Sequence, residues 1–393
     1  MKNNLKAYNY AFFFIIIIFI FQLYIPVVKE TLSNTGSSDF QWKPATCLFN
    51  GINHYEAYLK NDLSCDRFMT QHGEYLQGFY LILYPFTLLS WTNAKLIWFL
   101  FNFILLFFFL NLITNTFRIY GLKKIIIFFF SFSAIITKIH FIMGQQAIFT
   151  LFFLTLPFIN KSRLSYFFSG LCYFKYNIGF ALFLYLLSTK NYKNILISMI
   201  PSILGWLAYS YLTKTSLLIN AFEPFLLMIK NFKVITNDLN QVFLFTSFMN
   251  LTSNFYLNFI VIILFIFIFT LFFIIKISKI NDDLTKISLL CLVILSALPH
   301  WSHDYVLIIP LFILSVRDFH KSLLHKINFF LAVYFLHLSK GIFLYFINFL
   351  NFLETSNQFI NFTGNMYPYL NILVLIICLM TNLEIYKNKL RDG

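Results

Sequence analysis

This chain of 393 residues is 59% hydrophobic and only 11% charged, whereas soluble globular domains are about a quarter charged. The composition excludes a soluble globular protein and leaves no polar stretch long enough for a separate soluble domain. A net charge of +14 would suggest nucleic-acid binding in a soluble protein, but in membrane proteins Lys and Arg collect in cytoplasmic loops. We therefore expect an all-α polytopic membrane protein that does not bind nucleic acid.

Apolar runs along the chain predict about twelve transmembrane helices in a single integral membrane domain, residues 1–393. The first run, Tyr10 to Val28, is ~19 residues long and has no small-residue cleavage site after it, so we interpret it as a retained helix and not as a signal peptide. The predicted spans are 9–28, 95–116, 125–142, 147–159, 164–174, 178–188, 195–212, 256–275, 287–299, 304–316, 327–349 and 367–384.

The run from Leu76 to Trp91 is ambiguous. If it crossed the membrane, every later loop would change sides and the basic clusters would lie outside, against the positive-inside rule. Gly78 and Pro85 are typical of a broken segment. We expect this run to lie on the outer leaflet or to dip into it as a re-entrant segment.

With twelve spans and both termini in the cytoplasm, most Lys and Arg residues fall on the inner side. Two long loops then face outward, 29–94 and 213–255, which we call the first loop and the second loop. Both mix polar and aromatic residues, which is typical of amphipathic segments at the interface. A short basic tail, 385–393, lies in the cytoplasm. This topology predicts a multi-pass protein of the cell's inner (plasma) membrane.

The five cysteines fall into two groups. Cys47 and Cys65 lie in the first loop, which this topology exposes to an oxidising compartment, so they are candidates for a disulfide that braces the loop. Cys172, Cys291 and Cys378 lie in predicted spans and are interpreted as packing residues. The sequence has no Cys/His spacing typical of a metal site.

Several predicted spans are too short for a bilayer, because about 20 helical residues are needed to cross it. The short spans are joined by three polar turns on the outer side, 144–146, 175–177 and 300–304. We expect these three polar turns to lie below the outer membrane surface and to face one pocket, since ionisable groups at that depth are typically functional. The residues involved are Gly144, Gln145, Gln146, Lys175, Tyr176, Asn177, His300, Trp301, Ser302, His303 and Asp304.

Each polar residue also has a purely structural interpretation. Lys175 can extend to the outer headgroups, and the two glutamines can form interhelical hydrogen bonds. The histidines can cap a tight turn, and Asp39 can be an ordinary loop acid or a helix N-cap. Their common location on the predicted outer side favours the functional interpretation.

The order of these features resembles the GT-C superfamily of integral-membrane glycosyltransferases, and in particular family 87, the polyprenyl-phosphate-mannose-dependent mannosyltransferase type. The first of the shared motifs, Ser38-Asp39-Phe40, directly follows the first predicted span. In the second motif, His54 stands where the family usually has proline. The likeness covers most of residues 1–320 through short motifs. They are Ser38-Asp39-Phe40, Gly51-Ile52-Asn53-His54-Tyr55, Tyr84-Pro85-Phe86, Gly144-Gln145, Lys175 and Pro299-His300-Trp301-Ser302-His303.

This resemblance implies a GT-C-like fold whose active site faces the periplasm or exterior and takes a hexose, mannose-like, from a polyprenyl phosphate to a lipid or glycan acceptor. A carboxylate is needed to accept the proton of the acceptor hydroxyl, and a cation is needed to hold the departing phosphate. Asp39 suits the base and Lys175 the phosphate. His303, with His300, suits the phosphate or the tuning of Asp39.

The remaining expected site residues bind the donor. Gln145, with Gln146, suits hydrogen bonds to the sugar or phosphate, and Trp42 and Tyr55 suit stacking on a sugar ring. The first loop has no Asp-x-Asp pair, so we expect no cofactor and metal independence.

Two other functions remain open. Transporters or flippases of lipids and glycolipids also use broken helices and membrane-embedded charges, although no internal repeat is evident here. A surface-polysaccharide polymerase or ligase also acts on lipid-linked sugars. The sugar, the acceptor and the oligomeric state are not predicted.

Overall fold

Nearly all of the described chain is helical. The computed structural model describes residues 22–33, 40–65, 71, 73, 75–235, 241–242, 255–298, 300–338 and 371–384. Within these ranges the only β-structure is an antiparallel pair of two-residue strands, β1 (Gln241–Val242) and β2 (His300–Trp301). The fold therefore belongs to the expected helical class.

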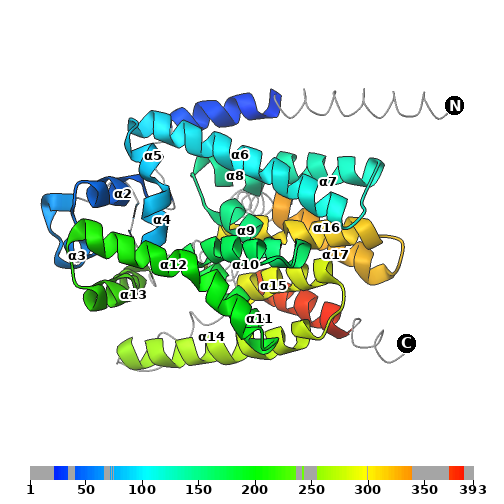
Figure 1. Cartoon of the computed structure of the whole chain (residues 1–393). Coiled ribbons are helices and arrows are strands. Elements are labelled where there is room, and N and C mark those ends of the chain that lie inside the picture. Colours follow the sequence, from blue (N-terminus) through cyan, green and yellow to red (C-terminus); the bar gives the residue numbers. More distant parts are fainter. Residues whose placement is uncertain are drawn as a thin grey trace, which may run out of the picture.

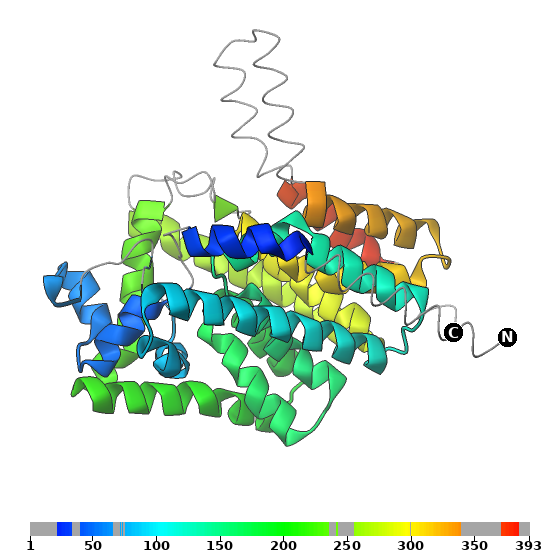
Figure 2. The same cartoon turned by 90° about the horizontal axis from the view of Figure 1, so that it is seen from above.

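The first loop forms a group of short helices at one end of the molecule (Figures 1 and 2). A helix over residues 22–33 precedes it. The run predicted to be broken, 76–91, forms two short helices, and Pro85 lies in the first turn of the second, where its missing N–H costs nothing. The elements are α2 (Trp42–Phe49), α3 (His54–Lys60), η1 (Leu63–Cys65), α4 (Gln77–Ile82) and α5 (Tyr84–Thr87).

Helices of 5 to 26 residues form the rest of the described chain and pack as a bundle beside the first loop (Figure 1). They are α6 (Trp91–Thr116), α7 (Leu122–Ser133), α8 (Ile135–Ile142), α9 (Ala147–Ile159), α10 (Arg163–Ser169), η2 (Gly170–Phe174), α11 (Tyr176–Ser188), α12 (Tyr192–Thr213), α13 (Leu217–Ile235), α14 (Phe255–Ser278), α15 (Asp283–Ala297), η4 (Ser302–Ile308), α16 (Ile309–Asp318), α17 (Leu323–Val333), η5 (Tyr334–Leu338) and Asn371–Glu384.

Three helices in the described part of the chain are long and apolar enough to cross a membrane: α6, α12 and Ile260–Ser278 of α14. A fourth is added if α7 and α8, which meet at a bend of 49°, form one broken span. These helices fit a helical membrane protein. The expected twelve spans go further than this, because helices such as α9 and α11 are apolar but shorter than the ~20 residues of a straight crossing.

The centre of the bundle is α15. Its residues from Leu284 to Ala297 are buried, apart from partly exposed Lys286, because α9, α11, α14, α16 and η4 pack around it. A helix that is largely apolar on all sides is shielded from water either by protein or by lipid, and α15 is shielded by protein.

A close contact between two glycines holds the first loop against the bundle. A Cβ on Gly205 of α12 would overlap the backbone of Gly78 in α4. Only glycine allows two helix backbones to approach this closely, as in the small-residue contacts of membrane helices. The Gly78 at the start of the broken run therefore fixes where α4 lies on α12.

Charged hydrogen bonds hold the N-terminus of α15 to the C-terminus of α16. Arg317 donates to the two carboxylate oxygens of Asp282 at 2.9 and 2.8 Å and to those of Asp318 at 3.1 and 2.9 Å. Burial alone would raise the pKa of both carboxyl groups, but the hydrogen bonds and charge of Arg317 outweigh it and hold the pKa of Asp282 and of Asp318 below its usual value. Both carboxylates are therefore ionised partners of one guanidinium.

Candidate functional site

A buried ion pair lies at the meeting point of two of the three polar turns. The ammonium nitrogen of Lys175 lies 2.9 Å from Oδ1 of Asp304, and the two side chains are 5% and 1% exposed. The residues are 129 positions apart in the sequence, so the pair joins turn 175–177 to turn 300–304. Charges buried to this degree need a close partner to persist, and this pair defines the candidate site.

The lysine stands at the tip of a hairpin formed by η2 and α11. Gly170, at the start of η2, lies so close to α12 that a Cβ there would overlap the carbonyl group of Ser198. The chain then reverses at Lys175, whose carbonyl accepts the N–H groups of Ile178 and Gly179 at 3.0 Å. The tight hairpin places Lys175 inside the bundle and not at its surface.

The glutamine turn is also buried. Gln145 and Gln146 have no exposed surface, and the carbonyl of Gly144 accepts the indole N–H of Trp98 at 3.0 Å. This turn leads into α9, which packs against both η2 and η4, while α8 packs against η4. The elements that carry the three polar turns are therefore brought together.

The third turn pairs with the second loop through its backbone. Val242 is opposite His300, and Gln241 is opposite Trp301. The side chains of His300 and His303 lie outside the described part of the structure, so their predicted roles remain predictions.

Asp39, the predicted base, lies outside the described residues, but the next residue is well defined. Phe40 has no exposed surface and stacks on Trp91 and Trp98 of α6, with ring centroids 5.8 and 5.1 Å apart. The same Trp98 donates to the Gly144 carbonyl. The chain directly after Asp39 therefore packs against the residue that holds the glutamine turn.

The two predicted sugar-stacking residues differ in exposure. Trp42 is partly exposed, and its indole N–H donates to the carbonyl of Phe86 at 3.0 Å. Tyr55 has no exposed surface, and its ring lies against His54 and Tyr209, with centroids 4.0 and 5.3 Å away. Tyr55 thus presents no ring face to a sugar in this structure, because neighbouring rings occupy the space.

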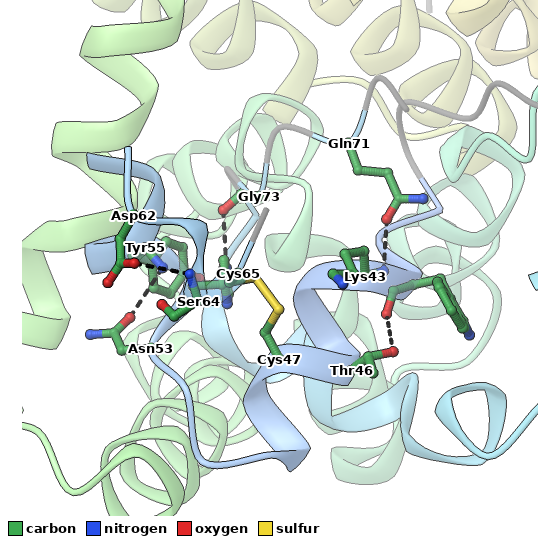
Figure 3. Close-up of a disulfide and its surroundings, with 12 residues drawn as sticks. Lys43, Thr46, Cys47, Asn53, Tyr55, Asp62, Ser64, Cys65, Gln71 and Gly73 are labelled. Atoms are coloured by element: carbon green, nitrogen blue, oxygen red, sulfur yellow. Dashed lines mark hydrogen bonds between the residues drawn. A yellow bond between two sulfur atoms is a disulfide. The ribbon is translucent and has the colours of Figure 1, made fainter. Parts of the chain in front are cut away.

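The cysteines of the first loop are joined. A disulfide links Cys47 in α2 to Cys65 in η1, with Cα atoms 5.9 Å apart (Figure 3). Near it, Gln71 accepts the backbone N–H of Lys43 at 2.8 Å. The bridge therefore fixes two short helices that have little core of their own.

A buried polar network between the first loop and α13 was not predicted from the sequence. Asn53, the N-cap of α3, donates through its amide to both carboxylate oxygens of Glu223 at 3.0 and 2.8 Å. The hydroxyl of Tyr209 donates to Oδ1 of Asn53 and lies 3.0 Å from Nδ1 of His54. The only signal in the sequence was an isolated acid, Glu223, within an apolar stretch.

Burial shifts the ionisation of two members of this network. It lowers the pKa of His54 to about 3, although a hydrogen bond with the carbonyl of Gly73 opposes the shift. It raises the pKa of Glu223, and the hydrogen bond from Asn53 opposes that shift. His54 is therefore a neutral imidazole at neutral pH.

No group of three or more His, Cys, Asp or Glu side chains in the described part of the chain is placed to hold a metal ion. Asp304, which the sequence placed in the third polar turn without a role, is engaged by Lys175.

Comparison of the chain with protein-family models, with curated proteins and with solved structures gives no match. The resemblance to family 87 is therefore carried by the short motifs alone.

Proposed function

We propose that this protein is a polytopic membrane glycosyltransferase that moves a hexose, mannose-like, from a polyprenyl phosphate to a lipid or glycan acceptor on the outer side of the membrane. The observation that carries the proposal is the buried Lys175–Asp304 pair, which joins two of the three polar turns. A recessed cation held by a carboxylate suits a site that receives a phosphate.

In the proposed reaction the acceptor oxygen forms a bond to the anomeric carbon as the bond from that carbon to the phosphate oxygen breaks. Asp39 accepts the proton of the acceptor hydroxyl, and the polyprenyl phosphate leaves as an anion. A single displacement of this kind inverts the anomeric centre, and it needs no carboxylate nucleophile.

Lys175 binds the departing phosphate in this proposal. An ammonium group has three donors, so it can contact Asp304 and a phosphate oxygen together. Asp304 compensates the buried charge of the lysine and orients it before the donor arrives. Gln145, Gln146, His300 and His303 supply further contacts to the phosphate or sugar, and Trp42 supplies a stacking face.

The proposal includes the predicted topology. About twelve helices cross the plasma (inner) membrane, both termini are cytoplasmic, and the site opens to the periplasm or exterior. The reaction proceeds without a metal ion.

The test is an assay in reconstituted membranes with labelled polyprenyl-phosphate hexoses. We expect Asp39→Asn to abolish transfer while leaving the protein folded, and Lys175→Met to abolish transfer at a cost in stability that is measured separately. Matched controls are Glu56→Gln, a partly exposed acid of the first loop, and Lys214→Met, an exposed lysine after α12, and both should retain activity. Full activity of Asp39→Asn would overturn the assignment of the base.

The same assay separates the alternatives. Flipping of a labelled lipid without transfer, unchanged in Asp39→Asn, would indicate a transporter. Formation of long glycan products from a lipid-linked oligosaccharide would indicate a polymerase or ligase.

A further inference from the structure

The polarity of α13 is the reverse of that of a helix on a water-exposed surface. Between Leu217 and Lys230 the buried residues include the polar Asn220 and the acidic Glu223. The exposed side chains are all apolar, with exposed fractions of 70% for Leu218, 58% for Ile219 and 58% for Phe222. A helix of a hydrated loop would direct its polar groups outward.

The inner face of α13 finds hydrogen-bond partners in the first loop and α12. Glu223 accepts both of its bonds from Asn53, and the side chain of Asn220 donates to the hydroxyl of Ser210 at 2.9 Å. The backbone carbonyl of Asn220 accepts the side-chain N–H of Gln77 at 2.5 Å. The polar groups on this face therefore have no need of water.

Lys230, further along α13, also finds its hydrogen-bond partners in the first loop. Lys230 donates to the carbonyls of Tyr58 and Leu59 at 2.8 and 3.0 Å and to Oδ1 of Asn61 at 2.9 Å. These carbonyls belong to the C-terminal turn of α3, where a cation is favourable. Both charged side chains of the described inner face are thus directed at protein.

The apolar outer face of α13 continues onto α12. The indole N–H of Trp206 donates to the carbonyl of Leu217 at 3.0 Å, and the two helices pack together next to α3 (Figure 1). On α12, one of the helices long and apolar enough to span a membrane, the exposed residues include Ile203, Leu204 and Leu207.

We propose that α13 lies in the hydrocarbon of the outer leaflet and not in the aqueous compartment, with Leu218, Ile219 and Phe222 against lipid acyl chains. A contiguous apolar patch on a water-facing loop would promote aggregation. In the bilayer, acyl chains can instead cover the outer faces of α12 and α13 as one continuous apolar surface. Lipid is therefore the partner that fits, and the Asn53–Glu223 hydrogen bonds lie at membrane depth. This inference uses the proposed topology, which puts residues 213–255 on the outer side, but it does not depend on the glycosyltransferase activity.

The test uses the full chain in phosphatidylcholine nanodiscs with an environment-sensitive fluorophore on a single new cysteine. Leu218→Cys and Phe222→Cys report on the outer face of α13, and Glu56→Cys on α3, where the native side chain is 44% exposed, is the matched control. Labelled protein without a new cysteine gives the background. We expect nitroxides on the acyl chains to quench positions 218 and 222 strongly and aqueous iodide to quench them weakly, with the reverse at position 56.

Two results would overturn the proposal. Strong iodide quenching at positions 218 and 222 would place the face in water. Protection from both quenchers would place it against protein, and cross-linking between copies would then identify a second copy as the occupant. If either variant fails to elute as a single species, Ile219→Cys on the same face replaces it.

Discussion

The side-chain amide nitrogen of Asn53 lies 3.0 and 2.8 Å from the two carboxylate oxygens of Glu223, although the residues are 170 positions apart. Asn53 also caps α3, since its Oδ1 accepts the backbone N–H groups of Tyr55 and Glu56. One side chain therefore closes a helix and fastens α13 to the first loop.

Asn53→Ala should lower the free energy of unfolding by about 1–3 kcal/mol, because it removes the cap and leaves the buried Glu223 without its donor. Thermal unfolding in nanodiscs measures the change. In a double-mutant cycle, Glu223→Ala should cost much less in the Asn53→Ala background than in the original chain. Simple additivity of the two changes would contradict the proposed coupling.

Variants of the Lys175–Asp304 pair can distinguish its contribution to stability from its contribution to activity. Lys175→Met and Asp304→Asn should each destabilise the protein by about 3–5 kcal/mol, because each leaves a buried group without its partner. The double variant Lys175→Met/Asp304→Leu should recover most of that stability but no transfer activity. The pair between exposed Lys161 and partly exposed Asp283 is a suitable control, and Lys161→Met should cost less than about 1 kcal/mol.

If transfer returned together with stability in the double variant, the role of Lys175 in binding phosphate would be refuted while its structural role would stand. Loss of stability in the single variants without recovery in the double variant would instead show that the packing around the pair, and not its charge, is decisive.

Lowering the pH should destabilise the protein through protonation of His54 in the unfolded chain. Burial holds its pKa at about 3 in the folded protein, against about 6.5 for an unfolded chain. Between these values the unfolded state binds a proton that the folded state does not, so stability is lost as pH falls, by up to about 1.4 kcal/mol per pH unit. His54→Gln should flatten this slope between about pH 6.5 and pH 3.

Other buried acids also contribute to the acid dependence of stability: burial raises the pKa of Glu223, and Arg317, against the effect of burial, lowers the pKa of Asp282 and of Asp318. The useful quantity is therefore the difference in slope between the original chain and His54→Gln. An unchanged slope in His54→Gln would contradict the assignment to His54.

The disulfide should stabilise the first loop by restricting the unfolded chain. It joins residues 18 positions apart, and closing a loop of that length is worth about 3 kcal/mol in the chain-entropy account. Cys47→Ala/Cys65→Ala should therefore unfold at a lower temperature and expose the loop to protease. Dithiothreitol should lower the unfolding temperature of the original chain only, and an equal shift in the double variant would exclude the disulfide as the cause.

The broad fold follows from the sequence because hydrophobic runs and breakers act locally. The runs near 95–116, 195–212 and 256–275 predicted the helices α6, α12 and α14. Pro85 predicted the break that separates a long run into α4 and α5. The number of membrane crossings stays a prediction, because hydrophobicity does not distinguish a short crossing from a helix enclosed by protein.

The partners of individual side chains could not be predicted. The sequence indicated that Lys175 and the 300–304 turn lie close together. It did not indicate that Asp304 would be the residue in contact, because that depends on which side of η4 faces Lys175. Tyr55 was expected to face a sugar, yet rings from α4 and α12 cover it. Such contacts arise from tertiary packing between distant segments, which local patterns do not encode.

The enclosure of α15 constrains the order in which its part of the bundle can assemble. A helix of 15 residues is shorter than the roughly 20 residues needed to cross a bilayer. Its neighbours in the fold include α9, α11 and α14, which are synthesised before it, and α16, which is synthesised after it. The burial of α15 is therefore completed only after α16 has been synthesised and has packed against it. We expect these helices to assemble as a group and not one at a time.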